Sequence, residues 1–349
     1  MPACCCSRLE PAVNRELTER GVIETARRRG IAPHSGVRVG IGDDCAVLDA
    51  EPGIPLVATT DLLIEDVHFR RRYAEPADIG WKSLAVNLSD IASMGGRPRW
   101  ALVALACPDG TSADEIEAFY EGMHALARDH EVTIVGGDTS SSPRGWTVNV
   151  TLLGQAAQPR LRSTARPGDV LAVTGPLGRS AAGLAVLERG APANVPAALL
   201  ADVTGAHLRP APRVREGRWL GETDGVTAMI DLSDGLATDV EHIAESSGVG
   251  AKVDLARVPV SDSVRRVAQS LDADAIAWAT GGGEDYELLL ACSSDAIGRV
   301  ADGLASATGT TLTVVGEVTT GSGVRFVDRA GREAVVGTGW QHFGPGRRS

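Results

Sequence analysis

Lysine is almost absent from this sequence. Only Lys82 and Lys252 occur among the 34 basic residues, so arginine carries nearly all of the positive charge. The chain has no GxxxxGK(S/T) segment, and no glycine-rich loop is followed by a VAIK-like strand. If the protein handles nucleotide phosphates, it must therefore do so without a P-loop and without the lysine of a protein kinase.

Long apolar runs are also missing. No stretch of about 18 apolar residues occurs, which is the length that a membrane-spanning helix needs, and the N-terminus lacks the apolar core of a signal peptide. The net charge is −11, from 34 basic and 45 acidic residues, whereas a nucleic-acid-binding surface shows a basic patch. We therefore expect a cytoplasmic protein that binds neither a membrane nor a nucleic acid.

Cysteine is present but is not spaced for a metal or for a disulfide framework. None of the six cysteines forms a CxxC pair, which argues against structural zinc and against a set of disulfides. We interpret Cys107 and Cys292 as small core residues at strand ends. The run Cys4-Cys5-Cys6 is interpreted as part of a disordered end and not as a redox site.

The pattern of expected elements is mixed α/β. At about 150 residues per domain, 349 residues suggest about two domains. In the first part, valine-rich segments bounded by glycine or polar residues predict strands at 37–42, 56–63, 100–107, 132–137 and 146–154. Apolar spacing predicts helices over 77–95 and 112–130, the second beginning with a Ser112–Glu115 capping box. We expect these helices to cover one side of a sheet.

A polar segment, GQAAQPRLRSTARPGD (154–169), interrupts this pattern. It combines glycine, proline and three arginines without an apolar period, which predicts a domain boundary near residue 157. The predicted domains are therefore 1–157 and 158–349. The pattern is expected to resume in the second domain with a strand at 170–175 and a glycine-rich segment at 175–190. A strand that turns into a helix is expected at 228–248, further strands at 286–292 and 312–318, and a helix at 295–309.

Aspartates recur at strand ends, at glycine turns and at an inward-looking helix position. The seven are Asp43, Asp44, Asp61, Asp90, Asp138, Asp231 and Asp234. α/β proteins build ligand sites at such strand ends, and Mg²⁺ combines a few protein carboxylates with waters and substrate phosphates. With the hydroxyls of Thr59 and Thr60, the set predicts several Mg²⁺ ions that hold a polyphosphate. Turn or N-cap chemistry explains any one of these aspartates equally well, so the prediction depends on the whole set.

Seven ordered segments carry a family resemblance. They are GIGDDCAV (40–47), TTDLLIEDVHF (59–69), KSLAVNLSDIASMG (82–95), VGGDTS (135–140), RSTARPGD (162–169), IDLSDGL (230–236) and GGGEDYEL (281–288). Their order closely resembles bacterial thiamine-monophosphate kinase, from about residue 36 to the closing GWQHF. The wider superfamily includes aminoimidazole ribonucleotide synthetase, selenophosphate synthetase and a hydrogenase-maturation protein, all of which use ATP without a P-loop.

The resemblance implies a fold and an activity. An N-terminal α/β domain would pair with its twin in a homodimer, and a C-terminal α/β domain would close over ATP. The γ-phosphate of ATP would pass directly to thiamine monophosphate and give thiamine diphosphate, with Mg²⁺ as the cofactor.

The resemblance also implies residue roles. The metal ligands would be Asp43, Thr59, Thr60, Asp61, Asp90, Asp138, Asp231 and Asp234. ATP would contact Gly137, Asp138, Arg162, Ser233 and Tyr120. The substrate pocket would contain His68, Glu284 and Trp340. The segment FRRRYAEPADIGW (69–81) is slightly longer than in the family, and Asp66 stands where glycine is common.

The chemistry implied by this resemblance needs no general base. The second pKa of a phosphate monoester is about 6, so the attacking oxygen is already anionic at neutral pH. What the reaction needs is positive charge against the ATP phosphates, which metals held by carboxylates supply. The thiazolium ring carries a fixed positive charge, which suits the aromatic face of Trp340 and the carboxylate of Glu284.

Two other functions remain open at this point. The first is another ATP-using enzyme of the superfamily. Selenophosphate synthetase is disfavoured, because its reactive cysteine stands in a glycine-rich, lysine-containing segment, whereas Cys4 to Cys6 do not. The hydrogenase-maturation member ends in a cysteine tail, whereas this sequence ends in GPGRRS. A non-catalytic sensor of ATP–Mg²⁺ is the other, and a turnover assay separates it from an enzyme.

Overall fold

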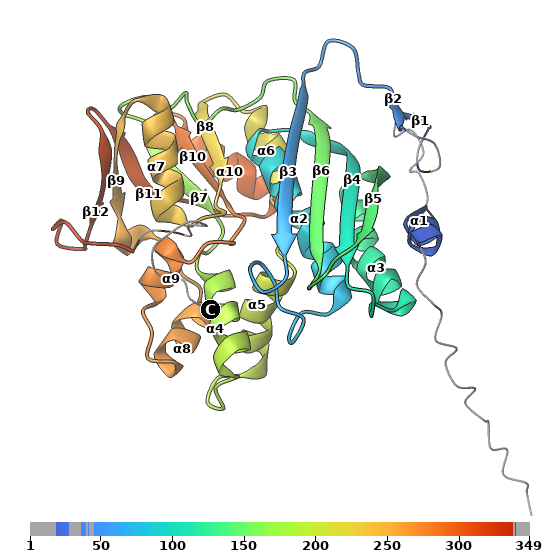
Figure 1. The fold of residues 1–349 in the computed structure, drawn as a ribbon. Coiled ribbons are helices and arrows are strands. Elements are labelled where there is room, and N and C mark those ends of the chain that lie inside the picture. The colour runs from blue at the N-terminus through green and yellow to red at the C-terminus, as the bar shows by residue number, and fades with distance from the viewer. Residues whose placement is uncertain (1–18, 28–35, 40, 42–44, 338, 340–349) are drawn as a thin grey trace, which may run out of the picture.

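The structure is a computed structural model that describes residues 19–27, 36–39, 41, 45–337 and 339. Two large β-sheets stand side by side, and helix α2 (Pro76–Ser93) lies between them (Figure 1). The chain is therefore mixed α/β, as predicted. The described residues before the first large sheet form α1 (Glu19–Arg27) and the short strand pair β1 (Val37–Val39) and β2 (Val47–Leu48).

The first large sheet has four strands and one helical face. Its strand order is β3 (Leu56–Ile64), β6 (Thr147–Gln155), β4 (Arg97–Cys107) and β5 (Thr133–Ser141). The first three are antiparallel neighbours, whereas β4 and β5 are parallel. A parallel pair needs a crossover connection, which α3 (Ala113–Asp129) provides. Helices α2 and α3 pack against the same face of the sheet, as the sequence predicts (Figure 1).

The two helices are fixed by a cap and by a close crossing. The predicted capping box is present: Glu115 N donates to Ser112 Oγ at 3.3 Å, and Ser112 N donates to the Glu115 carboxylate at 2.7 Å. The helices cross at Gly122 of α3, where a Cβ atom would lie 1.8 Å from the carbonyl oxygen of Ala77. Only glycine allows this approach, which sets the position of α2.

The opposite face of the four-stranded sheet carries apolar side chains that are exposed. On β3, Leu62 and Ile64 are 48% and 36% exposed, whereas Leu63 between them is 4% exposed. On β4, Leu102 is 37% exposed. Side chains alternate between the faces of a strand, so these residues form one apolar outer face, which we call the outer sheet face (Leu62, Ile64, Leu102).

The second large sheet has six strands and is covered on both faces. Its order is β12 (Gly323–Val327), β9 (Gly250–Asp254), β11 (Leu312–Thr319), β7 (Val170–Thr174), β10 (Leu288–Cys292) and β8 (Val226–Asp231). Alternate residues of β10 enter different cores: Leu289 packs with α7 (Leu236–Ser247), and Leu290 packs in the core that includes α6 (Val214–Gly221) and α10 (Ile297–Thr308). Cys292 is fully buried at the end of β10, and Cys107 is 8% exposed at the end of β4, which confirms both as core residues at strand ends.

Four shorter helices gather below the sheets in Figure 1. They are α4 (Arg179–Arg189), α5 (Ala197–Leu208), α8 (Asp262–Ser270) and α9 (Ala275–Gly281). A small core of their own holds them together, including Val186, Val203 and Val264. A 3₁₀ turn, η1 (Leu255–Arg257), directly follows β9.

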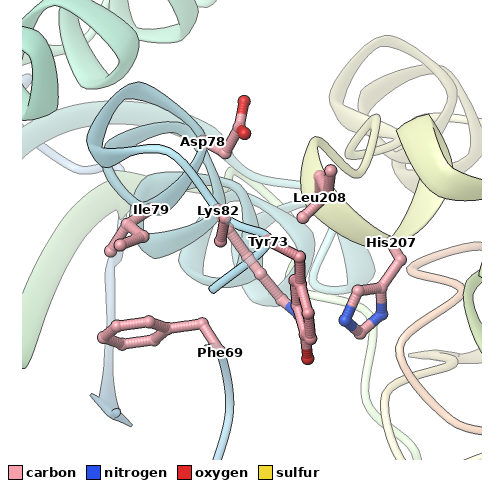
Figure 2. A pocket seen from close by; sticks show the side chains of 8 residues that line it. Phe69, Tyr73, Asp78, Ile79, Lys82, His207 and Leu208 are labelled. Atoms are coloured by element: carbon pink, nitrogen blue, oxygen red, sulfur yellow. The ribbon is translucent and has the colours of Figure 1, made fainter. Parts of the chain in front are cut away.

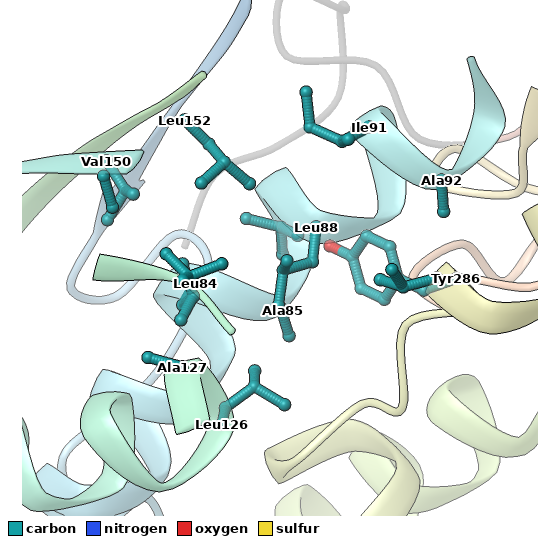
Figure 3. Close-up of a cluster of buried hydrophobic side chains, with 14 of the residues drawn as sticks. Leu84, Ala85, Leu88, Ile91, Ala92, Leu126, Ala127, Val150, Leu152 and Tyr286 are labelled. Atoms are coloured by element: carbon teal, nitrogen blue, oxygen red, sulfur yellow. The ribbon is translucent and has the colours of Figure 1, made fainter. Parts of the chain in front are cut away.

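Helix α2 joins the two halves of the molecule. Its Leu88 faces β6 on one side and Tyr286, from the segment before β10, on the other (Figure 3). Helix α6 approaches from the second half so closely that a Cβ atom on Gly217 would lie 2.2 Å from the carbonyl oxygen of Ala92. One continuous core therefore runs through α2, and the division at residue 157 stays a prediction. Among the described residues, no helix combines the length and the apolar character needed to cross a membrane.

Candidate functional site

Three of the predicted metal ligands meet beside α2, between the two sheets. Asp61 lies on β3, Asp90 on α2, and Asp231 is the last residue of β8. The Thr59 hydroxyl of β3 donates a hydrogen bond to the Asp90 carboxylate, and Ser89 Oγ of α2 donates to Asp231 Oδ2 at 2.7 Å. We call Asp61, Asp90 and Asp231 the carboxylate cluster.

The ionised form of the carboxylate cluster is unfavourable unless a cation binds beside it. Burial, followed by the charge of Asp90, raises the pKa of Asp61 to about 7. Burial and the charge of Asp90 raise the pKa of Asp231 well above its usual value. Burial also raises the pKa of Asp90, against the opposing effects of the Thr59 hydroxyl and of the Arg162 charge. Like charges held together in a buried site destabilise one another unless a cation offsets them.

The donor set of the carboxylate cluster fits Mg²⁺. Carboxylate and hydroxyl oxygens are the ligands of this hard cation, and Thr59 adds its hydroxyl on the same face of β3 as Asp61. Thr60 points to the opposite face, where its Oγ1 donates to the carbonyl oxygen of Val150 at 3.2 Å. Its side chain is therefore directed away from the carboxylate cluster within one chain.

Asp138 lies far from the carboxylate cluster within one chain. It is on β5, three strand positions from β3, which corresponds to about 14 Å at the usual strand spacing. Asp138 is exposed and pairs with Ala104 of β4. Leu102 lies two residues before Ala104 and belongs to the outer sheet face, so Asp138 lies on that face too. The preceding Gly137 has a φ of 153°.

A second group of ligands surrounds Asp234, in the turn between β8 and α7. One ligand atom from each of Asp234, Asp239 and His242 lies within 4.8 Å of the others. Asp239 Oδ2 also accepts a hydrogen bond from Gly235 N at 3.1 Å, which caps α7. The charge of Arg162 acts on both His242 and Asp90, so this guanidinium stands near both acidic groups.

The predicted substrate residue Glu284 has a buried cation beside it. Lys82 of α2 places Nζ 2.8 Å from Glu284 Oε1 and donates to the carbonyl oxygen of His68 at 3.3 Å. His207 of α5 has Nδ1 at 3.3 Å from Glu284 Oε2. Figure 2 shows Lys82, Tyr73 and His207 around the same small cavity. Burial opposes ionisation of Glu284, but its polar neighbours, with the charge of Lys82 first among them, together outweigh burial and lower the pKa of this carboxyl group.

The backbone around Glu284 adopts a costly conformation. Glu284 and Tyr286 have φ values of 58° and 51°, in the left-handed region, where a non-glycine residue costs about 1–3 kcal/mol and often marks a functional site. The strain is held by two hydrogen bonds: Glu284 N donates to the carbonyl of Ser233 at 2.7 Å, and Tyr286 N donates to that of Leu232 at 2.9 Å. The predicted ATP residue Ser233 and the predicted substrate residue Glu284 are therefore adjacent.

Known proteins resemble this chain on both sides of the segment at 157–165. The family of AIR synthase related proteins matches twice, with its N-terminal domain at residues 42–156 and its C-terminal domain at 166–329. Thiamine-monophosphate kinase of Bacillus subtilis is 43% identical over 238 residues, which are 67% of this chain and 72% of that protein. The chain belongs to the thiamine-monophosphate kinase family.

Solved structures of the thiamine-monophosphate kinase family share the fold. The enzyme from Stenotrophomonas maltophilia K279a is 37% identical, with a TM-score of 0.80 over 91% of this chain and 98% of that one. A structure of AaThiL complexed with AMPPCP and TMP is 31% identical, with a TM-score of 0.75 over 84% of this chain and 89% of that one.

Five of the residues that the sequence analysis assigns to ligands, His68 among them, remain to be placed. Tyr120 is 3% exposed, with its ring packed edge-on against Phe119 at 5.1 Å, so it offers no open surface to a nucleotide within one chain. His68 accepts a hydrogen bond from Ile64 N at its Nδ1, at 3.0 Å. The predicted ligands Asp43 and Asp44 and the predicted substrate residue Trp340 lie outside the described residues.

Sequence reasoning did not assign a role to Lys82 or to His207. A signal for Lys82 was available, because it lies three residues after Ile79 on the apolar face of the predicted helix, and a charge at such a position needs a partner. His207 carries no comparable signal, because nothing in the sequence places α5 opposite the segment that contains Glu284.

The glycine-rich turn before α4 is occupied by a side chain of this protein. Gly178 N and Ser180 N donate to the two carboxylate oxygens of Asp285, at 2.6 and 3.2 Å. A cavity of about 300 Å³ lies beside it. Its arginines are paired with acids: Arg179 with Asp202, Arg209 with Asp78 and Arg213 with Glu287.

Proposed function

We propose that the protein is a thiamine-monophosphate kinase, which uses ATP to convert thiamine monophosphate to thiamine diphosphate. The observation that carries the proposal is that two unlike sites lie against the same helix, α2. The carboxylate cluster suits a metal-bound polyphosphate, and the ionised Glu284 suits a cationic ring. Family members named for this reaction and a relative in complex with AMPPCP and TMP support the same substrates.

The proposed reaction is a direct phosphoryl transfer. A phosphate oxygen of thiamine monophosphate attacks the γ-phosphorus of ATP, a new P–O bond forms, and the bond to the β-phosphate oxygen breaks to release ADP. The attacking oxygen is already anionic near pH 7, so no residue is assigned as a general base. Catalysis then depends on positioning and on charge stabilisation.

Metal binding, phosphate contact and recognition of the substrate ring fall to different residues. Asp61, Asp90 and Asp231 would hold Mg²⁺, with Thr59 beside them, and Asp234 would hold a further ion. Bound Mg²⁺ supplies positive charge against the triphosphate. Arg162, whose charge acts on both acidic groups, would contact a phosphate, and Glu284 would face the thiazolium ring.

We also propose that the outer sheet face forms a homodimer. Leu62, Ile64 and Leu102 expose apolar area on one face of the sheet, and such a patch on a folded protein is typical of an interaction site. Asp138 lies on the same face, which gives this predicted metal ligand a place near the subunit boundary. The occupant would be a second copy of this chain.

Replacing Leu62 with Asp tests the dimer. The side chain is 48% exposed, so the fold should tolerate the change, while a charge within an apolar interface should separate the subunits. Light scattering should give about twice the chain mass of 36.3 kDa for the wild type and about the single mass for Leu62→Asp. Val335→Asp is the matched control because Val335 is fully exposed elsewhere. A monomeric wild type would reject the dimer.

A product assay tests the reaction itself. Purified protein is incubated with ATP, Mg²⁺ and thiamine monophosphate, and the products are separated by chromatography. We expect ADP and thiamine diphosphate in equal amounts, and no phosphorylation of free thiamine, because its hydroxyl nucleophile would need a base. Binding of ATP–Mg²⁺ without transfer would favour the sensor, and efficient turnover of free thiamine would overturn the mechanism.

A further inference from the structure

The buried ammonium group of Lys82 has no role in the reaction described above. Lys82 is 3% exposed and is one of two lysines in the chain. Burying such a charge is costly unless it is paired, and its partner is the Glu284 carboxylate, 2.8 Å away. The pair joins α2 to the segment before β10, so it also links the two halves of the molecule.

Of the side chains around Glu284, Lys82 is the one that compensates the negative charge of the carboxylate. Burial, followed by the charge of Lys82, lowers the pKa of His207 to about 3, so His207 is neutral at physiological pH although its Nδ1 lies 3.3 Å from Glu284 Oε2. The same Nδ1 is 3.0 Å from the Ser180 hydroxyl, and the ring meets Tyr73 edge-on (Figure 2). His207 and Tyr73 therefore shape the surroundings of the carboxylate, and Lys82 is the cation that pairs with it.

Helix α2 also sets the distance between the two sites. Lys82 and Asp90 are eight residues apart on this helix, which corresponds to about 12 Å along its axis. The helix is held by the close crossings at Gly122 and Gly217. One rigid element therefore fixes Glu284, through Lys82, relative to the carboxylate cluster.

We propose that Lys82 is a positioning residue for substrate recognition, which keeps the Glu284 carboxylate ionised and oriented toward the positively charged ring of the substrate. Lys82 occupies one carboxylate oxygen, and an ionised carboxylate has about four acceptor positions, so capacity remains for the ligand. Without Lys82, a half-buried carboxylate more readily takes up a proton and loses its attraction for a cation. The inference rests on the proposed function, in which Glu284 faces the thiazolium ring.

Steady-state kinetics of Lys82→Met test this role. Methionine keeps the length and the apolar stem but removes the charge. The KM for thiamine monophosphate should rise by about 10- to 100-fold, the range expected when a hydrogen bond to a charged group is lost, while the KM for ATP should stay within about twofold. Lys252→Met is the matched control, because Lys252 is on β9 and pairs with Glu317 on the surface, and its kinetics should equal those of the wild type.

A double-mutant cycle separates positioning from packing. If Lys82 acts through Glu284, the double variant Lys82→Met/Glu284→Gln should bind thiamine monophosphate no more weakly than Glu284→Gln alone. Lys82→Arg, which keeps the charge, should recover part of the loss. The double variant carries no buried charge at either position, so it remains informative if Lys82→Met alone does not fold.

Three results would overturn the inference. They are an unchanged KM for thiamine monophosphate in Lys82→Met, additive losses in the double variant, and equal losses in both KM values. A wild type that binds thiamine monophosphate but does not phosphorylate it would reject the proposed function instead. Calorimetric titration of thiamine monophosphate into the wild type and Lys82→Met would then still decide the role of Lys82.

Discussion

The negative charges of the carboxylate cluster and of Glu284, which are wholly or partly shielded from water, are compensated in different ways. Asp61, Asp90 and Asp231 share a site in which each charge disfavours the next, and the described residues give none of them an ion-pair partner. Glu284 has the Lys82 ammonium at 2.8 Å and a lowered pKa. Both sites lie against α2.

The difference indicates what each site receives. A site whose carboxylates have no ion-pair partner among the described residues is incomplete until a cation binds, which suits Mg²⁺ carried with a nucleotide. A carboxylate that is already ionised and held needs no metal, and it suits an organic cation. The near absence of lysine from the sequence agrees with this division, because most of the positive charge on the phosphates would come from bound Mg²⁺, with Arg162 in addition.

The largest expected effect concerns Glu287, a buried carboxylate that pairs with Arg213. Arg213 holds both oxygens of Glu287, at 2.6 and 2.5 Å, and Glu287 is 3% exposed. Arg213→Met should lower the free energy of unfolding by about 3–5 kcal/mol, because it leaves an uncompensated buried charge. Urea unfolding measures this, and Arg213→Met/Glu287→Gln should recover much of the loss. A change below about 1 kcal/mol would show that the pair is not needed.

The next effect concerns catalysis by the carboxylate cluster. Asp61→Asn keeps the size and one oxygen but removes a charge that offsets a metal, so kcat/KM should fall by at least about 100-fold. Additional Mg²⁺, or Mn²⁺ in its place, should recover part of the activity. Asp302→Asn, on the exposed surface of α10, is the control. A loss that no metal concentration changes would point to misfolding or to proton transfer.

The smallest effect is on the stability of the metal-free protein. The pKa of Asp61 is about 7 in the fold against a usual 3.8, so the folded state holds a proton that the unfolded chain releases. This contribution is complete at low pH and is lost as the pH rises toward and through 7. In EDTA, the Tm of the wild type should therefore fall more from pH 5 to pH 8 than that of Asp61→Asn, by a few degrees. Parallel Tm curves in calorimetry would contradict the assignment.

Much of the fold follows from sequence patterns that act locally. The alternating strand at Leu56–Ile64, the apolar spacing of α2 and the Ser112 cap all appear where they are predicted. Strands β9 and β12 were not predicted. Gly250–Asp254 and Gly323–Val327 are short, begin with glycine and depend on pairing with each other and, for β9, with β11, which no local pattern reveals.

The site was harder to predict for the same reason. The sequence identified the aspartates by their strand ends, but the grouping of Asp61 with Asp231 depends on how two sheets pack across α2. The Lys82–Glu284 pair joins residues 202 positions apart, as the numbering shows, and only tertiary packing makes them neighbours. Asp138 is the opposite case. Its motif resembles that of a metal ligand, but the residue lies on the outer sheet face, away from the carboxylate cluster.

A magnesium titration of two variants tests the central claim most directly. The kcat/KM for thiamine monophosphate is measured against Mg²⁺ concentration for the wild type, Asp61→Asn and Lys82→Met. If the carboxylate cluster needs an external cation and Glu284 carries its own, Asp61→Asn should require more Mg²⁺ for half-maximal activity. Lys82→Met should keep the wild-type requirement at a lower maximum. Equal shifts in the magnesium requirement of both variants, or a shift in Lys82→Met alone, would contradict the account.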